Sequence, residues 1–265
     1  MRPKPCRVAT HSELQQMVAG KLMQDWSPQQ VSGCLKMEYP NDESPRVSHV
    51  TIYRSLFILG RRALKQELVR RLRSKRRVRR SRRASVYGHS QGRIVNALSI
   101  RERPAEVEDR AVPGHWEVDL LRGAGNTHVV TLVERRSRFC MWVKTPGKES
   151  STVAAVLSQH VGQLPAELRR SLTWDRGLEM APRKTFTMAT DMQVYFCDPQ
   201  SPWQRGSNEN TSGPLRQYLP KNADLSRFSQ SELDEIAPRL NTRPRQTLGF
   251  RTPSDKVQAS VASTS

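Results

Sequence analysis

The stretch His-Trp-Glu-Val-Asp-Leu-Leu at residues 115–121 decides the fold of the larger part of this chain. Polar and apolar side chains alternate along it, which is the pattern of a β-strand with one face against a core. One face carries His115, Glu117, Asp119 and Leu121, and the other carries Trp116, Val118 and Leu120. The stretch therefore predicts a strand with Asp119 near its middle and Glu117 as a rival carboxylate on the same face.

The residues that follow predict a mixed sheet. Short runs of β-type composition are separated by Gly-Ala-Gly-Asn and Arg-Arg-Ser-Arg turns, and helical patterns alternate with later runs. The expected strands are 115–121, 127–134, 139–144, 171–175 and 193–197, and the expected helices are 150–163, one from residue 202, and 230–241. Hairpin-linked strands followed by alternating helices and strands indicate an α/β domain with helices packed against the sheet.

Three acidic residues are the candidate catalytic groups. Asp119 lies inside its strand, Asp175 ends the strand at 171–175, and Glu209 lies two turns into a helix opened by the capping box Ser-Pro-Trp-Gln at 201–204. Carboxylates brought together from three elements can hold two Mg²⁺ or Mn²⁺ ions, which suit phosphodiester chemistry. The alternative is that all three acids are surface or capping groups, as most Asp and Glu are.

Residues 11–72 predict short amphipathic helices. Helices are expected to begin at Ser27, which opens the capping box Ser-Pro-Gln-Gln, and at Ser48, after a polar break at 38–45. These helices indicate a helix-turn-helix unit whose helix from Ser48 enters the major groove of DNA. A plain helical bundle has the same pattern, and the connecting segment is longer than the usual turn.

The charge of the chain predicts a polyanionic partner. Lys and Arg number 44 against 25 Asp and Glu, which gives a net charge of +19, and most of it lies in residues 61–83. We favour a phosphate-contacting arm there over a solvated linker. The residues expected to contact DNA are Ser48, His49, Thr51, Arg54, Arg76, Arg77, Arg79, Arg80, Arg205 and Arg216. The neighbouring Ser55 is also expected to face outward, and Arg54 can bind a phosphate or a guanine edge.

Several other classes of protein are excluded. The four cysteines form no Cys-x-x-Cys pair, which argues against a zinc ribbon and fits a reducing cytoplasm. No apolar run approaches ~20 residues, so no membrane span is expected. A glycine-rich loop of the Walker pattern is absent from the sequence, so nucleotide hydrolysis is not expected.

Longer segments of the chain closely resemble bacterial insertion-sequence transposases of the Asp-Asp-Glu type, in the family numbered thirty. The resemblance covers nearly the whole chain. The matching segments are WSPQQVSG (26–33), RVSHVTIYRSLF (46–57), KRRVRRSR (75–82), RERPAEVEDRAVPGHWEVDL (101–120), SLTWDRGLEMA (171–181), VYFCDPQSPWQRGSNENTSG (194–213), LRQYLPK (215–221) and LNTRPRQTLGFRTP (240–253).

This resemblance implies an integrase-like catalytic core of the ribonuclease H type and a helix-turn-helix reader of the element's inverted ends. Carried over by position, Asp119, Asp175 and Glu209 form the catalytic triad that holds two Mg²⁺ or Mn²⁺ ions. The expected domains are a shortened helix-turn-helix domain at 1–74, a basic arm and linker at 75–111, the catalytic core at 112–255 and a tail at 256–265. The expected partners are double-stranded DNA and further copies of the chain assembled on it, in the bacterial cytoplasm at the nucleoid.

The chain also departs from the family pattern. Only a short segment precedes Ser27, Val118 stands where the family has Gly, Pro182-Arg183 stands for Lys-His, and Pro214 replaces Leu. Proline inside a helix costs about 3 kcal/mol, so a kink just past Glu209 is expected, with Arg216 redirected. Two hypotheses follow: an active transposase that cleaves and transfers DNA ends, and an impaired remnant that only binds DNA. A non-specific nuclease of the same fold is a third.

Overall fold

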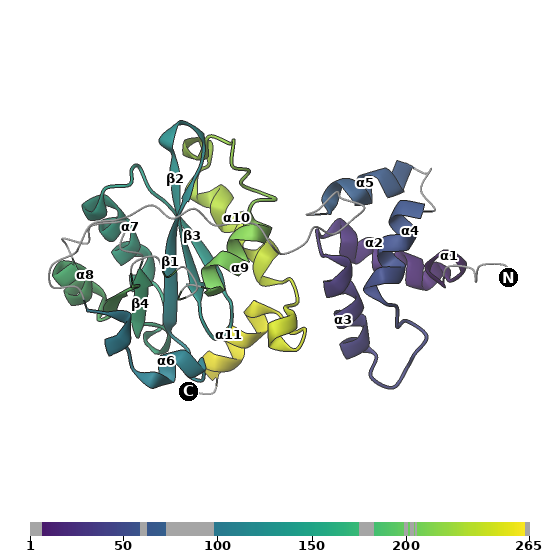
Figure 1. Ribbon diagram of the computed structural model, residues 1–265, viewed down its shortest axis with the longest axis horizontal. Helices are drawn as coiled ribbons and strands as arrows, with labels where there is room; N and C mark the ends of the chain where they lie inside the picture. Colours follow the sequence, from purple (N-terminus) through teal and green to yellow (C-terminus); the bar gives the residue numbers. More distant parts are fainter. Residues whose placement is uncertain are drawn as a thin grey trace. The chain divides into compact units, whose positions relative to one another are not determined.

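The chain divides into two compact units in the computed structural model (Figure 1). The first unit is formed by Met1–Ser85 together with Arg243–Thr252, and the second by Val86–Thr242 together with Pro253–Ser265. The residues that the structure describes are 7–58, 63–72, 98–174, 183–198, 201, 204 and 206–262.

Short helices surround one apolar core in the first unit. Their bounds are α1 Arg7–Thr10, α2 Ser12–Met23, α3 Pro28–Glu38, α4 His49–Ile58 and α5 Ala63–Arg71. The buried side chains recur three or four residues apart along each helix, so that each buries one stripe. They include Leu14, Val18, Leu22, Val31, Leu35, Ile52 and Leu56. The apolar spacing in the sequence predicted α2 to α5 correctly, while α1 was not predicted.

Both predicted caps in this unit are present. Ser27 and Gln30 form a reciprocal capping box at the start of α3, with Pro28 in the first helical position. Ser48 accepts a hydrogen bond from the main-chain N–H of Thr51 at 3.1 Å, so α4 begins at the next residue. Each cap satisfies main-chain N–H groups that have no partner within the helix.

A segment distant in sequence completes the first unit. The Gln30 side chain donates to the carbonyl oxygen of Pro244 at 2.9 Å, and the Arg243 guanidinium lies 3.8 Å from the Asp25 carboxylate. The ring of Phe250 lies against Gly33, where a Cβ would stand only 2.0 Å from a ring carbon. Glycine at position 33 is therefore required by this close approach.

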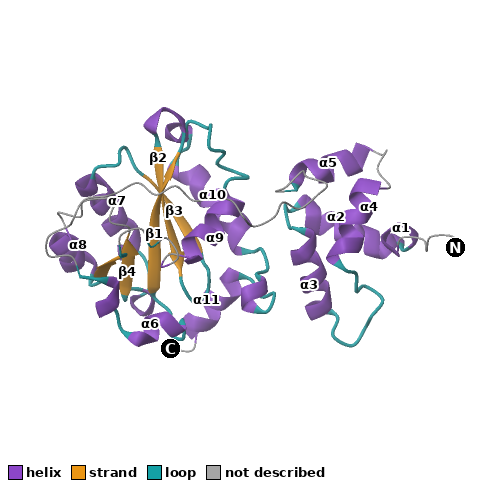
Figure 2. Cartoon of the chain, in the orientation of Figure 1, coloured by secondary structure: helices purple, strands orange, loops and turns teal. Residues whose placement is uncertain are grey.

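The second unit contains a five-stranded mixed sheet (Figures 1 and 2). Its strands are β1 His115–Arg122, β2 His128–Glu134, β3 Cys140–Lys144, β4 Ser171–Trp174 and β5 Gln193–Phe196, in the order β3-β2-β1-β4-β5. The first three pair antiparallel, as short hairpin connections allow, while β4 and β5 run parallel to β1. This confirms the predicted α/β class and the five predicted strands, with ends that differ by one residue.

Helices cover both faces of the sheet. On one face, α7 Ser150–Gly162 and α8 Arg183–Thr190 pack over Trp116 and Val118; on the other, α9 Gly206–Leu215 and α10 Gln230–Asn241 pack over Leu121. The expected alternation of side chains along β1 is therefore confirmed.

The last helix is α11 Pro253–Ala262, and single 3-10 turns lie at Ile100–Glu102, Ala124–Asn126, Ala166–Leu168, Leu225–Arg227 and Gln246–Leu248.

The described part of the expected linker is folded against the sheet. The main-chain N–H of Phe196 donates to the carbonyl oxygen of Leu98 at 3.0 Å, and Ser99 forms a parallel bridge with Phe196. Helix α6, Ala105–Asp109, follows and buries Val107 completely. Residues 98–109 thus extend the sheet beyond β5 and cover one end of it, which the polar composition of this stretch did not indicate.

Helix α9 spans Gly206–Leu215, and its predicted start at residue 202 lies outside the described residues. The Gln204 side chain of the predicted cap accepts the main-chain N–H of Asp198 at 2.8 Å. Pro214 lies inside the helix, but Leu215 is already its last residue. The main-chain N–H of Arg216 still donates to the carbonyl oxygen of Ser212 at 3.2 Å. The bond that proline removes is the one to the carbonyl oxygen of Asn210, so it spans residues 210–214, between Glu209 and the end of α9.

Candidate active site

Asp119 lies at the centre of β1 and is the candidate catalytic residue that the structure describes fully. Its side chain is half-buried, and Oδ1 accepts the main-chain N–H of Leu120 at 3.0 Å. Opposite it on β2 stands Thr131, whose hydroxyl donates to the carbonyl oxygen of Asp119 at 3.2 Å. The carboxylate thus stands on a rigid central strand and remains partly open to solvent.

The other two acids are described only in part. Asp175 lies outside the described residues, although β4 extends to Trp174, the residue before it. The main chain of Glu209 lies in the first turns of α9, and its side chain is not described. Within the described ranges, no group of three or more His, Cys, Asp or Glu side chains is arranged to hold a metal ion.

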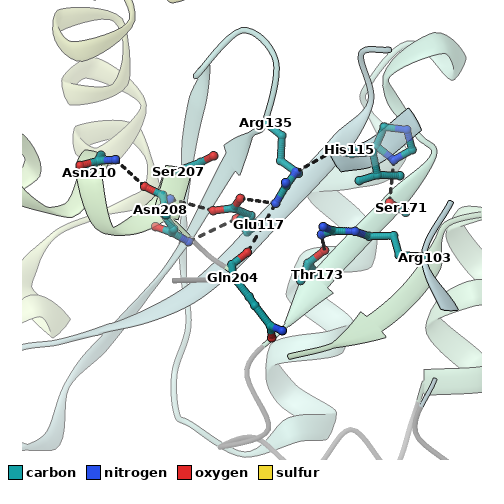
Figure 3. A network of polar contacts seen from close by, with 12 residues as sticks. Arg103, His115, Glu117, Arg135, Ser171, Thr173, Gln204, Ser207, Asn208 and Asn210 are labelled. Carbon is teal, nitrogen blue, oxygen red and sulfur yellow. Dashed lines mark hydrogen bonds and ion pairs between the residues drawn. The ribbon is translucent and has the colours of Figure 1, made fainter. Parts of the chain in front are cut away.

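Glu117, the rival of Asp119, and a further acid, Asp198, have structural partners instead. Glu117 is fully buried, with Oε1 2.6 Å from the Arg135 guanidinium and Oε2 accepting the main-chain N–H of Asn208 at 2.9 Å (Figure 3). Asp198 accepts the guanidinium of Arg101 at 3.2 Å and stands where β5 has just ended. Both carboxylates are therefore bonded within the fold.

Arg216 is the predicted DNA-contacting residue that the structure brings to Asp119. Its guanidinium donates to the carbonyl oxygen of Arg122, at the end of β1, at 3.0 Å. Burial lowers the pKa of Arg216, and the negative charge of Asp119 opposes that shift. The Arg216 guanidinium is thus held at the end of β1, and its positive charge lies near the Asp119 carboxylate.

A buried polar layer lies under the first half of β1. The Nδ1 atom of His115 is 2.7 Å from the Ser171 hydroxyl, and Arg103 donates to the Thr173 hydroxyl at 3.2 Å (Figure 3). Burial, together with the positive charges of Arg170, Arg103 and Arg135, lowers the pKa of His115 to about 4. The imidazole is therefore neutral at physiological pH and serves the packing of β1 against β4.

The predicted DNA-contacting residues of the first unit lie on α4. His49 and Arg54 are exposed, Thr51 is half-buried, and the exposed Ser48 uses its hydroxyl for the helix cap. The expectation that Ser55 faces outward was wrong: its side chain is buried and donates to the carbonyl oxygen of Ile52 at 2.7 Å. Arg76, Arg77, Arg79, Arg80 and Arg205 lie outside the described residues.

Sequence reasoning missed four residues that join the elements of the site. Arg135, Thr131, Gln204 and Asn208 connect β2, the segment before α9 and α9 itself to β1. Asn208 could have been suspected from the sequence, because it immediately precedes the predicted catalytic Glu209. Nothing in the sequence points to Arg135 or Thr131, because only the register of β2 on β1 brings them beside Glu117 and Asp119.

Comparison with known proteins identifies the class of the second unit. The model for the family described as "Integrase core domain" matches residues 109–202, which run from the end of α6 past β5. The mixed sheet, its strand order and this match define the second unit as an integrase-type core, consistent with a ribonuclease H-like fold.

Two relatives are similar over most of the chain. The "Transposase InsI for insertion sequence element IS30A" of Escherichia coli K12 is 45% identical over 264 residues, 99% of this chain and 69% of the relative. The "Transposase for insertion sequence element IS1086" of Cupriavidus metallidurans CH34 is 48% identical over 233 residues, 88% of this chain and 68% of the relative. The chain therefore belongs to the IS30 family of insertion-sequence transposases, a family of DNA transposases.

Proposed function

We propose that this transposase cleaves the ends of its insertion element and joins them to target DNA, with Asp119, Asp175 and Glu209 as its acidic triad. The register between β1 and β4 carries the proposal. Glu117 of β1 pairs with Thr173 of β4 in parallel. Asp119 and Asp175 each follow these partners by two residues, so a register continued by one pleat would set the two acids side by side.

The residues of the site fit divalent metal ions. Asp119 offers carboxylate oxygens on a half-exposed side chain, while the neighbouring Glu117 carboxylate is neutralised by Arg135. Carboxylates are the ligands that Mg²⁺ and Mn²⁺ prefer. Two such ions would supply Lewis-acid stabilisation of the attacking and leaving oxygens of a phosphodiester. Asp119 would ligate both ions, and Asp175 and Glu209 one each.

The protein side chains would orient the DNA around these acids. Arg216, held at the end of β1, is placed to neutralise a DNA phosphate near Asp119. A guanidinium already bonded to main chain loses little freedom when it binds a phosphate. Water would be the first nucleophile, and the freed 3′-hydroxyl of the element the second.

The first unit would recognise the element's inverted ends. We propose that α4 enters the major groove, with His49, Thr51 and Arg54 at the bases and phosphates. Val50, which sequence reasoning did not consider, is 46% exposed and lies one turn before Arg54 on the same face. An apolar side chain there suits contact with a thymine methyl group. The basic arm within residues 75–111 would follow the phosphate backbone of the DNA.

The proposal places this protein on DNA as an oligomer in the bacterial cytoplasm, at the nucleoid. Transposition joins two ends of one element, which requires two bound protomers or more. No helix among the described residues is long and apolar enough to cross a membrane.

An end-cleavage assay tests the proposed function. Labelled inverted ends are incubated with the full chain and Mg²⁺, beside the variant Asp119→Asn and DNA without the ends. An active transposase cuts only the ends and loses about 10³-fold or more of its rate in the variant, because the substitution removes a metal ligand. Binding without any cutting would instead identify an impaired remnant, and equal cutting of both DNAs a non-specific nuclease.

A further inference from the structure

Glu117 stands two residues before Asp119 on the same face of β1 but has a different role. Its side chain has no solvent exposure, and its two oxygens are used separately. Oε1 accepts the Arg135 guanidinium at 2.6 Å, and Oε2 accepts the main-chain N–H of Asn208 at 2.9 Å (Figure 3). A buried carboxylate needs both a counter-charge and hydrogen-bond donors, and these two contacts supply them.

The second half of this arrangement is the side chain of Asn208, the residue before Glu209. It is buried, and its Nδ2 donates to the carbonyl oxygen of Glu117 at 3.2 Å. Its Oδ1 accepts the hydroxyl of Thr131 at 3.0 Å. Both the main chain and the side chain of Asn208 are therefore bonded to the two central strands.

Thr131 connects this asparagine to the candidate catalytic strand position. In the antiparallel register it stands opposite Asp119, and its single hydroxyl hydrogen is shared between two acceptors, Asn208 Oδ1 at 3.0 Å and the Asp119 carbonyl oxygen at 3.2 Å. A continuous path thus runs from the main chain of Asp119 through Thr131 to Asn208, and from there along one peptide bond to Glu209. The path consists of main-chain and buried contacts, which leave little freedom for the first turn of α9.

Arg135 makes further contacts just before this turn. Its guanidinium lies 3.5 Å from the carbonyl oxygen of Gln204, just before α9, and its Nε donates to the carbonyl oxygen of Val107 at 3.3 Å. The negative charge of Glu117 lies at the N-terminal turn of α9, where the helix dipole favours it.

We propose that Glu117, Thr131 and Asn208 form a clamp that fixes the first turn of α9 on β1 and so sets the distance between the main chains of Asp119 and Glu209. The three are positioning residues for metal binding and not ligands. This inference rests on the proposed function, since it assigns the clamp to the same acidic site. Partners one layer removed from a metal commonly change its affinity by about 10- to 100-fold.

Binding of Mn²⁺ to the full chain without DNA, followed by the electron paramagnetic resonance signal of free Mn²⁺, tests the clamp. The variants are Asn208→Ala and Thr131→Val, which is close in shape to the parent, with Thr131→Ser as the conservative rescue. Thr211→Ala is the matched control, because within the described residues its buried hydroxyl bonds to the carbonyl oxygen of Ser207 in α9 and to no strand. Melting temperature and circular dichroism are recorded for each.

The clamp predicts that Asn208→Ala and Thr131→Val weaken Mn²⁺ binding about tenfold. Thr131→Ser and Thr211→Ala should bind like the parent, and all should bind element ends equally in the presence of a chelator. Parent-like Mn²⁺ affinity in folded Thr131→Val would overturn the clamp, as would an equal loss in Thr211→Ala. If Asp119→Asn loses Mn²⁺ in that case, the proposed function stands; if Asp119→Asn also binds like the parent, both fail.

Discussion

The side-chain amide of Asn241 bonds both main-chain groups of Cys140, accepting its N–H at 2.9 Å and donating to its carbonyl oxygen at 2.8 Å. Gln230, at the other end of α10, does the same for β3 by accepting the N–H of Lys144 and donating to the carbonyl oxygen of Trp142, each at 2.8 Å. The two amides lie about 16 Å apart along the helix, which suits a strand of about 13 Å. Helix α10 thereby satisfies the open edge of β3, which would otherwise invite pairing with another chain.

Asn241→Ala should destabilise the second unit by about 2–4 kcal/mol, because it leaves two buried main-chain groups without partners. Urea denaturation followed by circular dichroism measures the change. The neighbouring Thr242→Ala, which removes an exposed hydroxyl bonded within its own helix, is the control and should change stability by less than about 0.5 kcal/mol. Equal stability of the Asn241 variant and the parent would show that the edge bonds contribute little.

Val118→Gly should reduce stability by about 2–4 kcal/mol through the cavity and the backbone freedom that it creates. Val118 is fully buried in the core beneath α7 and pairs with Leu132 in the sheet, so the bulkier residue is accommodated by the packing. Thermal unfolding and the end-cleavage assay are measured together. Higher cleavage with unchanged stability would instead support the expectation that valine impairs this copy.

The stability of the second unit should fall as the pH is lowered from 6.5 to about 4. The pKa of His115 is lowered from 6.5 to about 4 in the folded protein, so between these values the unfolded chain binds the extra proton. The neutral imidazole thus stabilises the fold fully above pH 6.5, and up to roughly 3 kcal/mol of that is lost toward pH 4.

Urea denaturation at several pH values, with His115→Gln as the comparison, isolates this effect. Glutamine can still bond to Ser171 but does not titrate, so the slope of stability against pH should be smaller in the variant. Identical slopes in parent and variant would assign the acid sensitivity to other groups.

Arg54→Ala should weaken binding to element ends, because Arg54 is exposed on the outer face of α4. A base contact predicts a loss of about 1–3 kcal/mol with relaxed sequence preference, whereas a phosphate contact predicts a salt slope smaller by about 1. Fluorescence anisotropy at several salt concentrations distinguishes the two. Arg227→Ala, which removes an exposed arginine of the second unit, is the control and should bind ends like the parent.

The sequence predicted local structure well where one residue or a short pattern is sufficient. The capping box at Ser27 is present as expected, and α10 spans the predicted 230–241, with its own capping box at Ser229. The predicted start of α9 at residue 202 lies outside the described residues, and Gln204 of the predicted cap is bonded to Asp198. A capping pattern states which bond a side chain can make, but a folded neighbour decides which bond it does make.

By itself, the sequence determined the alternation of β1, the positions of the strands along the chain, and the acids that the chain offers to metal ions, because these depend on side-chain type and spacing along the chain. Only the tertiary structure decided that Glu117 is buried with Arg135 and Asn208 while Asp119 stays half-exposed. From the sequence alone, either of two carboxylates on the same face of one strand could be the metal ligand. They differ once β2 and α9 pack on them, since a buried charge is tolerated only where the fold supplies its partners.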